Sequence, residues 1–242
     1  MAQMILVTAG RGGVGKSTVT ALLGGALARA GKSVLLIEAS HRSLDVMFDV
    51  ADKVLFDLSD ILEGRCEVAE AMLQVGATER LQLICAPMEP FDEIPLAVCE
   101  ELMRALDTHF DFILVEADGH DRELLIVLTA VIDRAIIVAT ADPVSARDGR
   151  SVSDLLAAAG VIDIRLCVNM LPGDFLKQRA IPDLDWLIDQ ICAQLIAVIP
   201  YDKSMAVLHG LSQSINLSNI SKMVFDNFAQ RILGNYIDLL IQ

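Results

Sequence analysis

Short apolar segments recur along the chain, and most lead through glycine, proline or a carboxylate into a longer segment with helical spacing. The predicted strands span residues 4–8, 33–37, 81–85, 111–115, 135–139, 164–168 and 195–199. The predicted helices span residues 17–30, 55–63, 68–73, 95–109, 145–159, 184–193 and 223–241. Buried apolar strands that alternate with helices are typical of a mostly parallel sheet covered on both faces. We therefore predict an α/β fold, with a single three-layer domain over residues 1–242.

The first strand runs into a glycine-rich turn, Gly10–Thr18, which satisfies the pattern G-x-x-x-x-G-K-[ST]. Glycines allow successive backbone N–H groups to converge on phosphate oxygens, and the helix that follows adds the positive end of its dipole. In this pattern Lys16 reaches the β- and γ-phosphates and the Ser17 hydroxyl holds Mg²⁺. A chance glycine-rich turn is the alternative, but the flanking strand and helix are the context that the motif requires. The sequence thus predicts a fold of the P-loop NTPase type.

Two of the predicted strands end in acidic or hydroxyl side chains. Glu38 and Ser40 follow the second strand, and Glu116 and Asp118 follow the strand at 111–115. Parallel α/β sheets place their ligands at this carboxyl edge. A carboxylate there can hold Mg²⁺ through water, opposite the phosphate-binding turn, as in a Walker B element.

The charge balance narrows the class of partner. The chain has 33 acidic and 19 basic side chains, a formal net charge of −14, and no cluster of lysine and arginine. A protein that binds duplex DNA needs a basic face to displace counterions. We therefore expect no nucleic-acid partner.

Hydrophobic residues make up 54% of the chain, yet the apolar runs are too short and interrupted to cross a bilayer. The first residues enter a strand at once and lack the charged region of a signal peptide. The five cysteines are scattered and form no C-x-x-C pair, which is typical of reduced thiols. We therefore expect a cytoplasmic location.

The last predicted helix, residues 223–241, is amphipathic, with Phe225, Phe228, Ile232, Tyr236 and Leu240 at helical spacing. It either packs on the sheet or lies on a membrane. Helices that lie on membranes usually carry lysine and arginine on their polar face, whereas this one carries a single arginine and two aspartates. Packing on the sheet is the preferred interpretation.

With these motifs in view, the chain resembles the MinD/ParA family of deviant-Walker P-loop ATPases. Within that family it is most similar to the septum site-determining MinD proteins of Gram-positive bacteria. The similarity runs nearly end to end. The segments that carry it are residues 10–18, 43–46, 56–66, 110–115, 133–138, 144–148 and 198–202. The phosphate-binding turn is common to many NTPases, whereas the middle segments are more specific.

The resemblance implies that ATP sandwiches two subunits into a homodimer, and that hydrolysis to ADP separates them. The triphosphate would be bound by Gly12, Gly13, Val14, Gly15, Lys16, Ser17 and Thr18. Asn169 lies where the family recognises adenine, and Pro200, Tyr201 and Asp202 would line the base from the other side. Asn169 can alternatively brace a turn, and Pro200 is a common way to end a strand.

The chain departs from the family pattern at the signature lysine and at the end of the second strand. Arg11 replaces the lysine that reaches across the dimer, and it keeps the charge on a longer, planar side chain. The family's Asp-x-Asp reads Glu38-Ala39-Ser40 here. The first acid lies near Mg²⁺ and the second places the attacking water, so the uncharged Ser40 predicts slow hydrolysis.

A third departure follows the strand at 111–115, where Glu116 replaces an aspartate. Its extra methylene moves a metal-bound water by about an ångström, and misplacement on that scale costs around a hundredfold in rate. Asp118 either substitutes as the carboxylate or caps the next helix. The family's basic membrane-targeting tail has no clear counterpart, so we do not expect membrane cycling.

These observations predict an ATP-binding switch that positions or regulates a larger cellular assembly, such as the division machinery, through an unidentified regulatory protein. The residues predicted to act in turnover are Lys16, Arg11, Ser40 and Glu116, and those predicted to hold Mg²⁺ are Ser17, Glu38 and Glu116. Three alternatives remain: a catalytically degenerate nucleotide-binding scaffold, a ParA-like partitioning ATPase, and a metabolic enzyme on the same scaffold.

Overall fold

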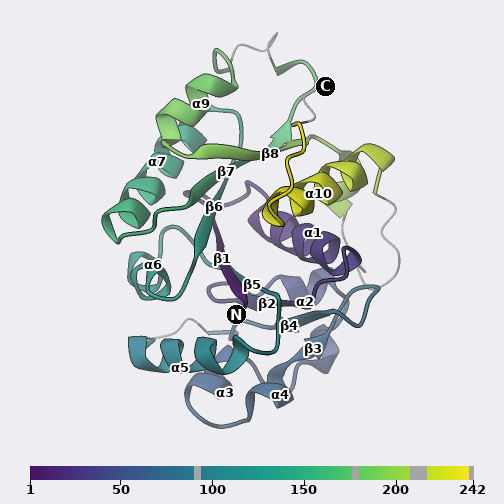
Figure 1. The fold of residues 1–242 in the computed structure, drawn as a ribbon, viewed down its shortest axis with the longest axis vertical. Helices are drawn as coiled ribbons and strands as arrows, with labels where there is room; N and C mark the ends of the chain where they lie inside the picture. Colours follow the sequence, from purple (N-terminus) through teal and green to yellow (C-terminus); the bar gives the residue numbers. More distant parts are fainter. Residues whose placement is uncertain (90–93, 176–179, 208–216, 240–242) are drawn as a thin grey trace.

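One sheet of eight strands forms the centre of the described residues, which are 1–89, 94–175, 180–207 and 217–239 of a computed structural model (Figure 1). The strands are β1 (Gln3–Thr8), β2 (Val34–Glu38), β3 (Leu73–Gln74), β4 (Leu81–Ile84), β5 (Phe112–Glu116), β6 (Arg134–Ala139), β7 (Ile164–Leu171) and β8 (Gln194–Pro200). Their order is β3-β4-β2-β5-β1-β6-β7-β8, and every pair is parallel except β3 with β4. The predicted α/β fold with a mostly parallel sheet is confirmed.

Helices cover both faces of this sheet. They are α1 (Lys16–Arg29), α2 (Leu44–Met47), α3 (Leu58–Leu62), α4 (Val68–Ala71), α5 (Leu96–Leu106), α6 (Arg122–Thr129), α7 (Pro143–Ala158), α9 (Leu184–Ile191) and α10 (Asn219–Ile232), with 3₁₀ turns η1 (Ala51–Lys53) and η2 (Lys203–Val207). One core contains buried residues of α1, α2 and α10, and the other contains those of α3, α5, α6, α7 and α9. Figure 1 shows α1 and α10 side by side on one flank and α6, α7 and α9 on the other. The division of the chain into domains remains a prediction.

The central strands are apolar because both of their faces are covered. Every residue of β2 and β5 is buried, and so are all but the first residues of β1 and β6. The chain leaves β1 through α1 on one face, and it leaves the neighbouring β5 through α6 on the other. The carboxyl ends of adjacent strands that are left on opposite faces are where α/β sheets bind their ligands.

The C-terminal helix packs on the sheet, as the sequence analysis prefers, but it is shorter than predicted. α10 ends at Ile232, and Gly234 follows with a φ of +85°. Phe225 and Phe228 are fully buried in the core that α10 shares with α1. Helical spacing predicts that Tyr236 lies on the apolar face, but the residue is 92% exposed because the helix has already ended. The predicted position of Leu240 lies outside the described residues.

The end of β2 places a carboxyl group inside the protein. Glu38 is 0% exposed, and its pKa is raised from 4.5 to about 7, chiefly by burial. The nearby charge of Glu116 adds to this rise, whereas hydrogen bonds from the backbone N–H groups of Leu44 and Ser43 offset part of it. The folded chain therefore binds a proton at this position more tightly than an extended chain would.

Substitution of Phe228 by alanine removes a fully buried aromatic side chain from the interface between α10 and the sheet. We expect Phe228→Ala to lower the free energy of unfolding by about 3–5 kcal/mol, measured by urea denaturation. Tyr236→Ala is the matched control and changes it by less than about 0.5 kcal/mol, because that ring is exposed. Equal losses in the two variants would contradict the packing of α10.

Glu38 also predicts a pH dependence of stability in the nucleotide- and metal-free chain. Between its unfolded pKa of 4.5 and its folded pKa of about 7, only the folded state holds the proton, so stability falls as pH rises through this range. At about 1.4 kcal/mol per pKa unit, Glu38 contributes a loss of roughly 3 kcal/mol. We expect Glu38→Gln to remove this contribution in urea melts at about pH 5 and about pH 8, while Glu101→Gln, which alters an exposed glutamate, retains it. An equally steep fall in Glu38→Gln would show that another group titrates.

Candidate functional site

The turn between β1 and α1 has the backbone that the glycine pattern predicts. Gly13 and Gly15 have φ angles of +79° and +85°, and Gly15 is the N-cap of α1. A Cβ at Gly15 would lie 2.3 Å from Nδ2 of Asn169, and one at Gly10 would lie 2.2 Å from the carbonyl carbon of Asp148. No side chain of the described residues caps α1, so its first N–H groups are left for an anion.

Lys16 and Ser17 meet the end of β5 at this turn. The ammonium group of Lys16 and the hydroxyl of Ser17 both donate to Oε1 of Glu116, each at 2.6 Å. The Glu116 side chain is only 3% exposed and that of Lys16 is 15% exposed, so water screens the ion pair weakly. The structure therefore brings together three residues that the sequence assigns to phosphate, metal and turnover.

Glu38 joins the same cluster from the neighbouring strand. Glu38 and Glu116 are paired in the register of β2 and β5, and Oε1 of Glu38 accepts hydrogen bonds from the backbone N–H groups of Ser43 (2.6 Å) and Leu44 (2.7 Å). The Ser43 hydroxyl lies 3.1 Å from the same oxygen and 3.0 Å from the Ser17 hydroxyl. Ser43 thus links the two glutamates through Ser17, a role that the sequence analysis missed although the residue lies in a recognised segment.

Each glutamate keeps one oxygen free for a further ligand. Oε2 of Glu38 and Oε2 of Glu116 are buried and have no hydrogen-bond partner among the described residues. A buried carboxylate oxygen without a partner is costly, whereas Mg²⁺ prefers oxygen ligands of this kind. The two carboxylates and the Ser17 hydroxyl therefore fit a magnesium ion.

Ser40 and Asp118 lie together beside this cluster. The Ser40 hydroxyl accepts a hydrogen bond of 2.8 Å from the backbone N–H of Asp118, and Nε2 of His41 lies 3.4 Å from Oδ2 of Asp118. The suggestion that Asp118 caps the next helix is wrong, because Asp121 is the N-cap of α6 and its side chain accepts from the N–H of Leu124. Asp118 instead accepts from the N–H of His120 and keeps its second oxygen toward His41.

Arg11 contacts the start of α7 in the same subunit. Its guanidinium lies 3.5 Å from Oδ1 of Asp142, which is the N-cap of α7 and accepts from the N–H groups of Val144 and Ser145. Burial alone would raise the pKa of Asp142, but a hydrogen bond from Thr140, the N-cap bonds and the charge of Arg11 lower it overall. The side chain of Arg11 is 41% exposed, so this contact leaves it accessible.

Asn169 lies behind the glycine-rich turn. It is 3% exposed, and its amide donates to the carbonyl oxygen of Val14 at 2.8 Å. This contact braces the turn, as the alternative prediction for Asn169 states, while its recognition of adenine stays a prediction. β7 continues past Asn169 to Leu171, whose carbonyl oxygen accepts from the N–H of Tyr201 at 2.9 Å.

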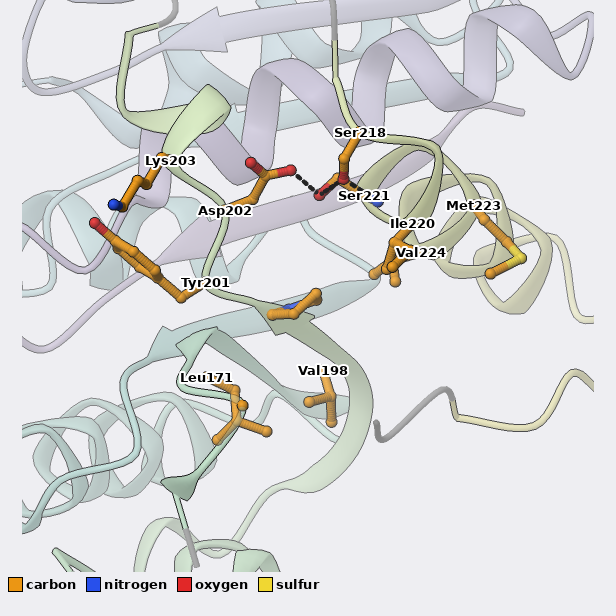
Figure 2. Close-up of a pocket in the computed structure, with 12 residues that line it drawn as sticks. Leu171, Val198, Tyr201, Asp202, Lys203, Ser218, Ile220, Ser221, Met223 and Val224 are labelled. Atoms are coloured by element: carbon orange, nitrogen blue, oxygen red, sulfur yellow. Dashed lines mark hydrogen bonds between the residues drawn. The ribbon is translucent and has the colours of Figure 1, made fainter. Parts of the chain in front are cut away.

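A cavity of about 620 Å³ opens where β7 and β8 end and α10 begins. Pro200, Tyr201 and Asp202, which the sequence assigns to the base, all line it. Figure 2 shows Leu171 and Val198 below this space, and Ile220, Met223 and Val224 beside it. The lining is therefore largely apolar and suits a flat ring.

The carboxylate of Asp202 already has partners within the protein. It accepts a hydrogen bond from the hydroxyl of Ser221 at 2.6 Å (Figure 2) and another from the hydroxyl of Ser204 at 2.7 Å. These bonds, with a contribution from Ser218, hold the pKa of Asp202 well below its usual range. Asp202 thus fastens the segment after β8 to the start of α10, which the sequence pattern does not reveal.

A family model and two relatives match most or all of this chain. A family model described as the CobQ/CobB/MinD/ParA nucleotide binding domain matches residues 5–212. The septum site-determining protein MinD of Bacillus subtilis is 27% identical over 248 residues, which cover 100% of this chain and 92% of that protein. The MinD of Synechocystis is 29% identical over 246 residues, covering 99% and 92%.

Solved structures extend the similarity to the fold. The chain matches a MinC:MinD cell division protein complex of Aquifex aeolicus with a TM-score of 0.88 and 28% identity, covering 99% of each chain. It also has the fold of the Pyrococcus horikoshii MinD complexed with Mg-ADP, with a TM-score of 0.79 and 22% identity over 96% of each chain. On the match across residues 5–212, the chain belongs to the CobQ/CobB/MinD/ParA family of nucleotide-binding domains.

Proposed function

We propose that the protein is an ATP-binding switch of the MinD type, which dimerises on ATP and positions or regulates a larger assembly in cell division or related spatial organisation. The observation that carries this proposal is the convergence of Lys16, Ser17 and Glu116 at the open N-terminus of α1. The full-length similarity to septum site-determining proteins supports the cellular role.

Different residues of the site contact the phosphates, the metal ion and the base of the nucleotide. The N–H groups from Gly12 to Thr18 bind the phosphates, and Lys16 exchanges the carboxylate of Glu116 for phosphate oxygens. Ser17, Glu38 and Glu116 hold Mg²⁺, which supplies charge neutralisation for the phosphates when it is bound. Pro200, Tyr201 and Asp202 line the cavity for the base. Asn169, which holds the turn through the carbonyl oxygen of Val14, is the residue for adenine recognition.

Slow turnover is part of the proposal. Ser40 has no charge to orient an attacking water, and the longer Glu116 carboxylate reaches both Lys16 and Ser17. Asp118, bonded through its N–H to Ser40, is the carboxylate available to take over that role. Arg11 reaches a partner subunit only after it leaves Asp142 of its own subunit.

We also propose a regulatory protein partner, because a relative of 28% identity is known in a MinC:MinD complex. No helix among the described residues combines the length and the apolar character that a membrane span needs. We propose a cytoplasmic location without membrane cycling. We also propose that the protein has no nucleic-acid partner, because its net charge is −14.

A second candidate is a nucleotide-binding scaffold that does not hydrolyse ATP. The three residues that favour it are Glu38, Ser40 and Glu116, which all differ from the family pattern around the γ-phosphate. The measurement that separates the two candidates is ATP turnover by the unmodified chain, because only a switch needs hydrolysis to return to its first state.

Lys16→Ala tests nucleotide binding directly. We expect calorimetric titration of ATP with Mg²⁺ to show at least a tenfold weaker affinity than in the parent chain, because the charge-assisted contact to phosphate is lost. Lys53→Ala, which alters an exposed lysine of η1, should bind as the parent does. A melting curve in the absence of nucleotide confirms that both variants are folded. Unchanged affinity in folded Lys16→Ala would reject the proposed binding site.

Ser40→Asp tests the cause of slow hydrolysis. We expect phosphate release by Ser40→Asp to exceed that of the parent by about tenfold or more, because a positioned carboxylate typically contributes 10²–10⁴-fold. Ser40→Ala is the matched control and should turn over as slowly as the parent. Parent turnover that is already fast and depends on Lys16 would contradict both the slow switch and the scaffold.

A further inference from the structure

A second cleft lies on the side of the sheet opposite α1 and α10. It has a volume of about 690 Å³ and runs between the pair α3–α4 and helix α5. Figure 1 shows these three helices together at one end of the molecule, below the labels of β2 and β4. The cleft shares no lining residue with the candidate nucleotide site.

The floor of this cleft is apolar. Ile61 and Leu62 of α3, Val68 of α4, and Val98 and Leu102 of α5 all line it. Leu102 is buried and the other four are half-buried, so the helices do not cover them completely. Aliphatic side chains left in this state gain free energy when a partner removes them from water.

The rim of the cleft is acidic. Glu63, Glu67, Glu70 and Glu101 line it and are all exposed. Arg65 is the basic residue among the described residues that line the cleft, and it forms salt bridges with Asp60 and Glu63. The rim therefore presents a net negative charge around an apolar floor.

We propose that this cleft binds a basic amphipathic helix of a partner protein, with apolar side chains on the floor and lysine or arginine side chains toward the glutamates. An apolar groove with a charged rim suits this mode of recognition, in which the apolar positions give affinity and the charges give orientation. Charge complementarity favours this occupant over the others. Nucleic acid and anionic membranes are repelled by the rim, and a second copy of this chain carries the same net charge of −14.

The first experiment measures binding of two fluorescein-labelled helical peptides to the full chain by fluorescence anisotropy. One peptide carries leucine at i, i+3, i+4 and i+7 with flanking lysines, and the other has glutamate in place of every lysine. We expect saturable binding of the lysine peptide only. We also expect at least tenfold weaker binding in 1 M salt than in 0.1 M salt, because the Debye length falls from about 10 Å to about 3 Å.

Variants then assign the binding to the cleft. Glu101→Lys and Val98→Asp alter its rim and its floor on α5, and each should weaken binding of the lysine peptide at least tenfold. Asp189→Lys alters an exposed acid on α9 by the same charge change and should leave the affinity unchanged. A urea melt measured in parallel reports whether each variant is folded. If Val98→Asp does not fold, Glu101→Lys decides, because that residue is exposed.

Several outcomes would overturn the proposal. These are the absence of saturable binding of the lysine peptide, equal binding of the glutamate peptide, and equal weakening in Asp189→Lys. A change in self-association on Glu101→Lys, measured by sedimentation velocity, would instead assign the cleft to a second copy of the chain. Because none of these readouts involves ATP, failure here leaves the proposed function untouched.

Discussion

The buried contact between Lys16 and Glu116 joins the loop after β1 to the end of β5, and the rest of the site is arranged around it. A lysine and a carboxylate with little exposure must pair, because an isolated charge in that position would be strongly destabilising. The pair therefore fixes the glycine-rich turn against the sheet. It also occupies the lysine that phosphate would otherwise contact, so a nucleotide has to compete with an internal carboxylate for it.

The two glutamates at the ends of β2 and β5 determine the electrostatics of this cluster. Glu38 and Glu116 stand side by side in neighbouring strands, and each uses one oxygen for hydrogen bonds and leaves the other without a partner among the described residues. Two carboxylates so close together repel each other, and burial raises the pKa of Glu38 to about 7. A divalent cation would remove this repulsion. The pKa of Glu38 should therefore be lower in the metal-bound chain than in the free chain.

The cavity between β7, β8 and α10 depends on contacts made far from the glycine-rich turn. Asp202, at the end of β8, is held by serine hydroxyls of η2 and α10, and Arg231 near the end of α10 donates to the carbonyl oxygens of Ile196 and Ile237. These bonds fasten the last helix to the edge strand. One wall of the cavity thus belongs to a segment that lies near the ends of β7 and β8 only because α10 returns to the sheet.

The sequence predicted seven of the eight described strands, most of the helices between them and the phosphate-binding turn, because these features follow from local periodicity and from glycine at fixed spacing. It also placed Glu38 and Glu116 at one edge of the sheet, since parallel strands end together. It missed the two-residue strand β3, which overlaps the end of a segment predicted as helix, and the helix α6 that connects β5 to β6. Only the tertiary structure decided that Ser43 joins the two glutamates, that Asp142 of the same subunit holds Arg11, and that Asn169 braces Val14. It also decided that Asp121 and not Asp118 caps α6, and that the last helix ends at Ile232. These outcomes depend on which distant segments meet, and side-chain spacing along one segment carries no information about that.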